Sequence, residues 1–296
     1  MPGRYLMLAA LLGTAMFCAS ATAAQSLPQM PALSAQDRVL VVAPHPDDES
    51  LCCAGLLQQA LEHGASVGVV WITAGDSFEL DAMLVERTLW PGSLTMRRLG
   101  TQRLGEAHAA ADVLGVPRSA QYQLGYPDRG VLALSGDYYA RPYRSKYTAV
   151  SAVPYAGAVS PGASYTGANL ERDLEHVIAL FRPTLVLAAA PQDRHPDHSA
   201  SGALVQRVLA RRGELSELRY WIVHAPGWPR PLGLEPEVPL APPAAAAALA
   251  WESLPLSEPQ RMRKLAALRD HRSQMQLLAP FMDSFVRANE IFAPAP

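Results

Sequence analysis

The tripeptide His-Pro-Asp occurs twice in the chain, each time shortly after a run of apolar residues. The first copy, residues 45–47, follows the apolar run 39–43, and the second, residues 195–197, follows the apolar run 185–190. Shuffling a chain of this composition gives roughly 0.03 such triplets. Short apolar runs bounded by turn residues predict buried parallel strands, and ligands of open α/β sheets gather beyond the carboxyl ends of such strands. The two triplets therefore predict a site that carries chemistry.

Strand-like and helical patterns alternate along the chain, as in an α/β protein. Apolar runs typical of strands lie at 39–43, 66–73, 185–190 and 219–224. Helical spacing of apolar residues is found at 51–63, 95–114, 169–181, 199–211 and 258–275. This alternation predicts a mainly parallel sheet with helices on both faces. Residues 25–296 are enough for one large domain of this kind.

The first 24 residues have the features of a secretory signal peptide. Arg4 is followed by a short apolar run, residues 5–18, and by small residues at 21–24. The apolar run is too short to span a bilayer comfortably, and an uncleaved anchor is the alternative. We therefore expect a secreted or periplasmic protein without a transmembrane segment after cleavage. Without Arg4 the formal net charge of −2 becomes −3, so no basic surface predicts nucleic-acid binding.

Two further features concern cysteine and tyrosine. The mature chain keeps only the adjacent Cys52 and Cys53, which we expect to pack rather than to form a disulfide. Residues 135–167 break the α/β pattern and hold six of the ten tyrosines. A long irregular segment is usually functional or disordered, and the aromatic composition favours an ordered flap that stacks on a substrate. The alternative is a satellite hydrophobic cluster.

Residues in and next to the triplets are suited to bind a metal ion. His45, Asp48 and His198, if they converge, supply two imidazoles and a carboxylate, which leaves an open position for water on a zinc ion. Iron or manganese can use the same ligands. Asp47 projects differently from Asp48 and is the candidate general base for the bound water.

The second triplet supplies the remaining candidates. His195 lies one helical turn from His198, where it can stabilise a developing oxyanion and protonate a leaving amine. Asp197 can orient His195. The alternative is that each triplet only starts a helix, with Pro in the first turn and Asp complementing the helix dipole. Two copies that each follow a buried strand make this alternative the weaker one.

At these positions the chain resembles the PIG-L family, also called the LmbE-like zinc deacetylases. The resemblance rests on residues 44–49 and 195–198, and it extends to weaker matches at 73–75, 103–106, 124–128 and 264–274. It implies a Rossmann-like fold and the removal of acetyl from N-acetylglucosamine groups on glycolipids, thiol conjugates and related glycosides. Residues 52–54, Cys-Cys-Ala, stand where the family usually has glycines.

The resemblance also implies roles for individual residues. It implies that His45, Asp48 and His198 bind zinc, one ion per chain, that Asp47 is the base, and that His195 is the acid and oxyanion stabiliser. It further implies that Arg103 and Asp128 contact sugar hydroxyls. The alternative for Arg103 is an exposed ion pair with Glu106, three residues further along a helix.

Together these features predict a secreted, metal-dependent N-deacetylase that acts on N-acetylglucosamine-type groups of a glycan, glycolipid or glycoconjugate. Two rival functions remain. An amidase for non-sugar amides could use the same scaffold, although it would not need Arg103 and Asp128 to contact hydroxyls. An inactive glycan-binding protein could keep the fold, although the intact Asp47 and the complete ligand set argue against it.

Overall fold

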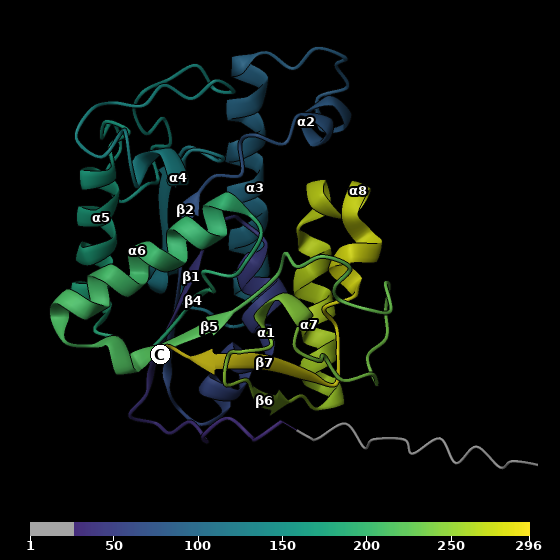
Figure 1. Cartoon of the computed structure of the whole chain (residues 1–296). Helices are drawn as coiled ribbons and strands as arrows, with labels where there is room; N and C mark the ends of the chain where they lie inside the picture. The colour runs from purple at the N-terminus through teal and green to yellow at the C-terminus, as the bar shows by residue number, and fades with distance from the viewer. Residues whose placement is uncertain (1–26) are drawn as a thin grey trace, which may run out of the picture.

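The computed structural model describes residues 27–296, so the predicted signal peptide, residues 1–24, lies outside the described residues. Seven strands form one sheet in the order β3-β2-β1-β4-β5-β7-β6 (Figure 1). The strands are β1 (Arg38–Ala43), β2 (Ser66–Thr73), β3 (Gln121–Tyr126), β4 (Leu185–Ala189), β5 (Leu218–Trp221), β6 (Glu252–Pro255) and β7 (Asn289–Pro294). Strands β1 to β5 are parallel, and β7 is antiparallel to both of its neighbours.

Helices cover both faces of the sheet. They are α1 (Asp48–Glu62), α2 (Glu79–Val85), α3 (Ser93–Val113), α4 (Val131–Leu134), α5 (Gly167–Phe181), α6 (Pro196–Arg212), α7 (Glu258–Asp270) and α8 (Arg272–Asp283). On one face α7 packs against α1 and α3, and on the other α6 packs against α4 and α5 (Figure 1). The predicted α/β class with a mainly parallel sheet is confirmed. Within residues 27–296, no helix is both long and apolar enough to cross a bilayer.

The order of the strands explains why the two triplets meet. The chain runs outward from β1 through β2 to β3 on one side and from β4 to β5 on the other, so the direction of winding changes between β1 and β4. Residues 39–43 in β1 and 185–189 in β4 are all buried, and the two strands pair directly. Each triplet follows one of these strands, and the switch point between them is where such sheets bind ligands.

The structure corrects the predicted bounds of three helices. Helices α1 and α6 begin at Asp48 and Pro196, each three residues earlier than predicted, because acidic residues and proline fit a first helical turn. The helix predicted over 258–275 is two helices that break at His271, whose φ and ψ are −77° and 58°. The side chain of His271 is buried against Ser50, a tertiary contact that helical spacing cannot reveal.

The prediction for the cysteines is wrong. Cys52 and Cys53 are joined by a disulfide inside the buried first half of α1. Their Cα atoms are only 3.8 Å apart, below the range that disulfides usually span. Because adjacent cysteines have this short separation, no disulfide was expected from the sequence.

Most tyrosines of residues 135–167 pack inward, whereas Tyr139 is exposed. Tyr155 and Tyr165 are buried in the main core, and Tyr138 packs edge to face on Tyr143. None of the six tyrosines lines the cavity that holds the two triplets. The contacts of Tyr155, Tyr165, Tyr138 and Tyr143 match the alternative of a hydrophobic cluster, and the stacking of this segment on a substrate stays a prediction.

Candidate active site

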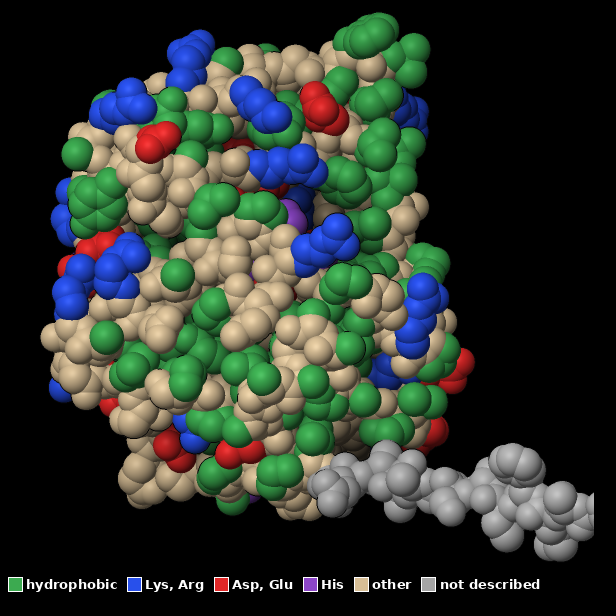
Figure 2. Space-filling view, viewed as in Figure 1, with side chains coloured by type: hydrophobic (Ala, Val, Ile, Leu, Met, Phe, Trp, Pro, Cys, Tyr) green, Lys and Arg blue, Asp and Glu red, His purple; other side chains and the backbone are tan. Residues whose placement is uncertain are grey.

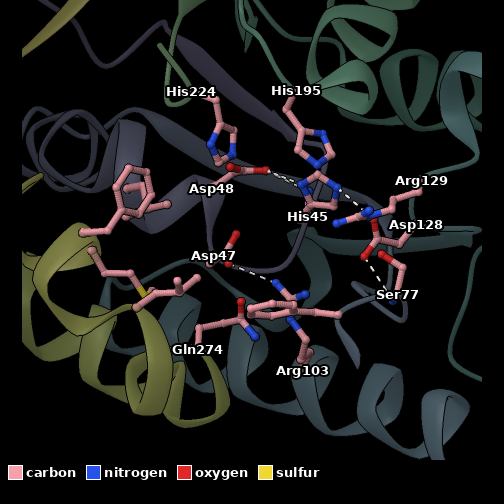
Figure 3. Close-up of a pocket in the computed structure, with 15 residues that line it drawn as sticks. His45, Asp47, Asp48, Ser77, Arg103, Asp128, Arg129, His195, His224 and Gln274 are labelled. Atoms are coloured by element: carbon pink, nitrogen blue, oxygen red, sulfur yellow. Dashed lines mark hydrogen bonds and ion pairs between the residues drawn. The ribbon is translucent and has the colours of Figure 1, made fainter. Parts of the chain in front are cut away.

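A cavity of about 200 Å³ opens beyond the carboxyl ends of β1 and β4. Figure 2 shows a histidine side chain (purple) in a hollow, with Lys or Arg side chains (blue) at the surface around it. Both polar and apolar side chains line the cavity. The polar lining residues include His45, Asp47, Asp48, Ser77, Arg103, Asp128, Arg129, His195, His224 and Gln274 (Figure 3). The apolar lining residues are Leu51, Phe78, Leu278, Phe281 and Met282.

The three predicted metal ligands converge, with His45 and Asp48 lining the cavity and His198 buried behind them. Nδ1 of His45 lies 3.1 Å from Nε2 of His198 and 3.4 Å from Oδ2 of Asp48. The same oxygen lies 3.3 Å from Nε2 of His198. Ligand atoms bound tetrahedrally at 2.0–2.1 Å are separated by roughly 3.3 Å, so this triangle fits a zinc ion. All three side chains are buried, which keeps their donor atoms in place.

The outer nitrogen of each histidine faces carboxylates. Nε2 of His45 lies 3.3 Å from Oδ1 of Asp128 and 3.5 Å from Oδ2 of Asp197. Nδ1 of His198 lies 3.1 Å from Oδ2 of Asp193. Carboxylates in this position fix the tautomer and the ring orientation of metal-binding histidines. Asp128, which was predicted to contact sugar hydroxyls, thus also faces a candidate ligand.

The charges of the triangle favour a cation. Burial alone would lower the pKa of His198, but Asp48 and Asp193 raise it to about 9. Burial likewise opposes the charged form of His45, yet Asp128 and its neighbours raise the pKa well above the usual value. Against the cost of burial, His198 holds the pKa of Asp48 well below its usual range. In such a cluster a divalent ion can replace the imidazole protons.

Asp47 lies beside the triangle and is not part of it. Its Oδ2 lies 2.9 Å from Nη2 of Arg103. Burial raises the pKa of Asp47 to about 6, and the positive charge of Arg103 opposes this rise. A carboxylate with such a pKa can accept a proton near neutral pH, as a general base must.

Arg103 is buried on α3, with only 4% of its surface exposed. Besides Asp47, it donates to the carbonyl oxygens of Gly75 and Pro46. Gly75 has a φ of +65°, and a Cβ at this position would overlap the guanidinium. Glu106 instead accepts hydrogen bonds from Ser273. The alternative of an exposed ion pair between Arg103 and Glu106 is therefore excluded.

His195 lies next to the candidate ligands, with its ring centre 4.7 Å from that of His45 and 5.0 Å from that of His198. Burial, together with the charges of His45 and His198, lowers the pKa of His195 to about 4. His195 is therefore neutral at neutral pH, and as a neutral imidazole it can donate one hydrogen bond.

Asp197 contacts the ring of His195 through its backbone N–H, which donates to Nδ1 of His195 at 3.2 Å, and not through the carboxylate that was predicted to orient His195. The carboxylate of Asp197 accepts backbone hydrogen bonds from Arg129 at 2.5 Å and Val131 at 3.1 Å, because its position near the start of α6 directs it toward the loop after β3. Asp193 lies closer to His195 and accepts the backbone N–H of that residue at 2.9 Å.

Asp193 and His224, which lie close to the triangle, are among the residues of this site that were not predicted from the sequence. Asp193 accepts the backbone N–H groups of Val223 and His224 in addition to facing His198. His224 follows β5, and burial lowers its pKa to about 3. Both lie beyond the carboxyl end of a parallel strand, as the triplets do, and this signal could have identified them.

The sequence model of the family described as PIG-L, GlcNAc-PI de-N-acetylase, matches residues 40–209 of this chain. The chain belongs to the PIG-L family. The predicted family is thus confirmed. The matched region ends before α8, so part of the apolar lining of the cavity comes from the following residues.

Individual relatives resemble the chain over most of its length. The 1D-myo-inositol 2-acetamido-2-deoxy-alpha-D-glucopyranoside deacetylase of Saccharomonospora viridis is 28% identical over 87% of this chain and 91% of its own. The structure of the A40926 pseudoaglycone deacetylase Dbv21 is 23% identical and covers 87% of this chain and 96% of its own, with a TM-score of 0.58. The N,N'-diacetylchitobiose deacetylase of Pyrococcus horikoshii is 19% identical and covers 88% and 85%, with a TM-score of 0.53. The two structures have the same fold as this chain.

Proposed function

We propose that this PIG-L protein is a secreted or periplasmic, metal-dependent N-deacetylase. Its substrate carries an N-acetylglucosamine-type group on a glycan, glycolipid or glycoconjugate. The observation that carries the proposal is the triangle of His45, Asp48 and His198, with donor atoms 3.1–3.4 Å apart. Two of its members, His45 and Asp48, line the same cavity as Asp47. The named activities of the relatives, which are deacetylases, support the reaction type.

The proposed metal is zinc, and iron or manganese fits the same imidazole and carboxylate donors. When bound, the ion acidifies a water molecule and polarises the acetamide carbonyl. The role of His45, Asp48 and His198 is to hold the ion, while Asp193 fixes the ring of His198.

Asp47 and His195 are the residues proposed to transfer protons, and Arg103 positions Asp47. Asp47 accepts a proton from the attacking water, and Arg103 holds its carboxylate toward the cavity. His195, as a neutral imidazole, would donate a hydrogen bond to the developing oxyanion. The proton that Asp47 takes from the water would pass to the amine as the C–N bond breaks, with His195 acting as the acid once it has received that proton. The products are acetate and a free amino group.

The apolar lining of the cavity indicates what else the substrate contains besides the amino sugar. Leu278, Phe281 and Met282 of α8 form an apolar wall of the cavity. An apolar chain attached to the sugar would cover more of this wall than the sugar ring alone. We infer that the wall contacts an apolar part of the conjugate that carries the amino sugar.

The test is acetate release from N-acetylglucosamine oligosaccharides and alkyl N-acetylglucosaminides by the purified chain 25–296. It is run with added zinc, with chelator, and with Asp47→Asn. The matched control is Asp137→Asn, which changes an exposed carboxylate outside the cavity. Release that is lost with chelator and in Asp47→Asn, but kept in Asp137→Asn, supports the proposal.

The same assay separates the two rival functions. Release of acetate from non-sugar acetamides alone would indicate an amidase. Absence of hydrolysis in a protein that binds one zinc ion and retains oligosaccharide on a column would indicate a glycan-binding protein.

A further inference from the structure

The backbone of Asp47 has a conformation that is rare for a residue with a side chain. Its φ is 155° and its ψ is −27°. Such conformations cost free energy and persist only where the surrounding structure holds them, often at functional sites. Because Asp47 is the proposed base, the contacts that hold its backbone also determine where its carboxylate points.

The side chain of Glu49 makes the contact at the backbone N–H of Asp47. Its Oε2 accepts this hydrogen bond at 3.3 Å and a second one from Nε1 of Trp71 at 2.8 Å. Arg103 binds the carboxylate of Asp47 from the other side. Asp47 is thus held at two points, at its backbone by Glu49 and at its side chain by Arg103.

Glu49 is itself fixed by residues from distant parts of the chain. Its Oε1 accepts a hydrogen bond from Ser50 Oγ at 2.8 Å and lies 3.2 Å from Nε2 of His271, at the break between α7 and α8. Glu49 is fully buried, and His271 and Trp71 are almost completely so. Among residues 27–296, those that line the cavity do not include Glu49, Trp71 or His271. These three residues therefore have no direct contact with a substrate in the cavity.

We propose that Glu49 is a positioning residue, which, braced by Trp71 and His271, holds the backbone of Asp47 so that the base faces the cavity. This inference rests on the proposed function, because it takes Asp47 as the base. The required property of Glu49 is an acceptor at the position of Oε2.

Two substitutions of similar size separate the effect of the acceptor at Oε2 from the effect of side-chain volume. Glu49→Gln can keep its carbonyl oxygen at the position of Oε2 and turn its amide toward Ser50 and His271, which can accept hydrogen bonds. Glu49→Leu fills a similar volume and removes the acceptor, leaving the N–H groups of Asp47 and Trp71 unpaired.

The experiment measures kcat, KM and bound metal for both variants, each alone and combined with Asp47→Asn. We expect Glu49→Leu to lower kcat about 100-fold, because small displacements of a catalytic group have effects of this size. In Glu49→Leu, KM and the metal content stay near those of the unchanged protein. Glu49→Gln keeps most of the kcat of the unchanged protein. In the Asp47→Asn background, Glu49→Leu has little further effect, because residues that act as a unit are not additive.

The inference is overturned if Glu49→Leu lowers kcat equally in both backgrounds, or if Glu49→Gln is as harmful as Glu49→Leu. Crystal structures of the two variants give a readout that does not depend on activity. We expect φ of Asp47 to leave the positive region in Glu49→Leu and to stay there in Glu49→Gln, and an unchanged φ in Glu49→Leu would overturn the inference. Failure of the proposed function gives a different result from failure of this inference. If Asp47 is not the base, Asp47→Asn alone leaves the activity unchanged.

Discussion

Nη2 of Arg103 donates a hydrogen bond to Oδ2 of Asp47 over 2.9 Å, and both side chains are largely buried. Arg103 was predicted to contact sugar hydroxyls, yet its hydrogen bonds go to Asp47 and to two carbonyl oxygens. The guanidinium therefore controls the charge and the direction of the proposed base.

Replacing Arg103 should move the acidic limb of the pH profile. Asp47 works only when deprotonated, and burial raises its pKa to about 6 against the positive charge of Arg103. Arg103→Met removes this charge, so the pKa of Asp47 should rise and the acidic limb should move to higher pH. At about pH 6 to 7 the variant should therefore lose activity that the unchanged protein still has. The measurement is kcat/KM for acetate release as a function of pH.

Arg103→Lys is the matched control, because it keeps the positive charge and loses the planar fork. Its acidic limb should move less than that of Arg103→Met. If neither variant moves the limb, Asp47 is not the group that titrates.

Asp193 should determine how tightly the metal is bound. Its carboxylate lies 3.1 Å from Nδ1 of His198, and loss of such a contact typically weakens metal binding about 10- to 100-fold. We expect this loss for Asp193→Asn in a chelator competition with zinc. Asp173→Asn is the control, since Asp173 is equally buried but binds Tyr126 and Ser160 away from the cavity. Equal affinity of both variants would contradict a role of Asp193 at the metal.

The sequence could predict the fold and the candidate ligands for one physical reason. Residues 45–48 and 195–198 follow buried parallel strands, and the ends of adjacent strands must lie close together. The contacts of Asp193 and Glu49 depend instead on how distant side chains pack. Asp193 binds backbone groups about thirty residues further along the chain, and Glu49 faces His271 across the break between two helices.

The tyrosines of residues 135–167 show a second limit of sequence reasoning. Their aromatic composition correctly indicated a folded segment, but composition does not show which way a side chain points. Tyr155 and Tyr165 point into the core, and the hydroxyl of Tyr155 reaches Asp76 at 2.6 Å. The segment therefore braces the loop after β2, and none of its six tyrosines lines the cavity.

The apolar wall on α8 predicts a dependence on the length of an alkyl aglycone. Burying a methylene contributes about 0.8 kcal/mol, so two buried methylenes are enough for about a tenfold change in KM. We expect octyl N-acetylglucosaminide to have a KM about tenfold below that of the methyl glycoside. Phe281→Ser should reduce this difference, whereas Leu180→Ser, an exposed leucine on α5, should not. Equal KM values for both glycosides in the unchanged protein would contradict contact with the wall.

Asp76 should make the stability of the protein fall as the pH rises toward neutral. Burial raises its pKa in the folded state to about 7, against the hydrogen bond from Tyr155. The folded protein therefore holds a proton that the unfolded chain releases above about pH 4, so this stabilisation is complete below pH 4 and is lost as the pH rises through about 7. Asp76→Asn mimics the protonated form, and its free energy of unfolding should lack this contribution to the pH dependence. Urea unfolding in the presence of chelator between pH 4 and 8 gives the comparison. In Tyr155→Phe the opposing hydrogen bond is removed, so the pKa of Asp76 should rise and the loss of stability should extend to higher pH. Parallel stability curves for the unchanged protein and Asp76→Asn would show that Asp76 is already ionised when folded.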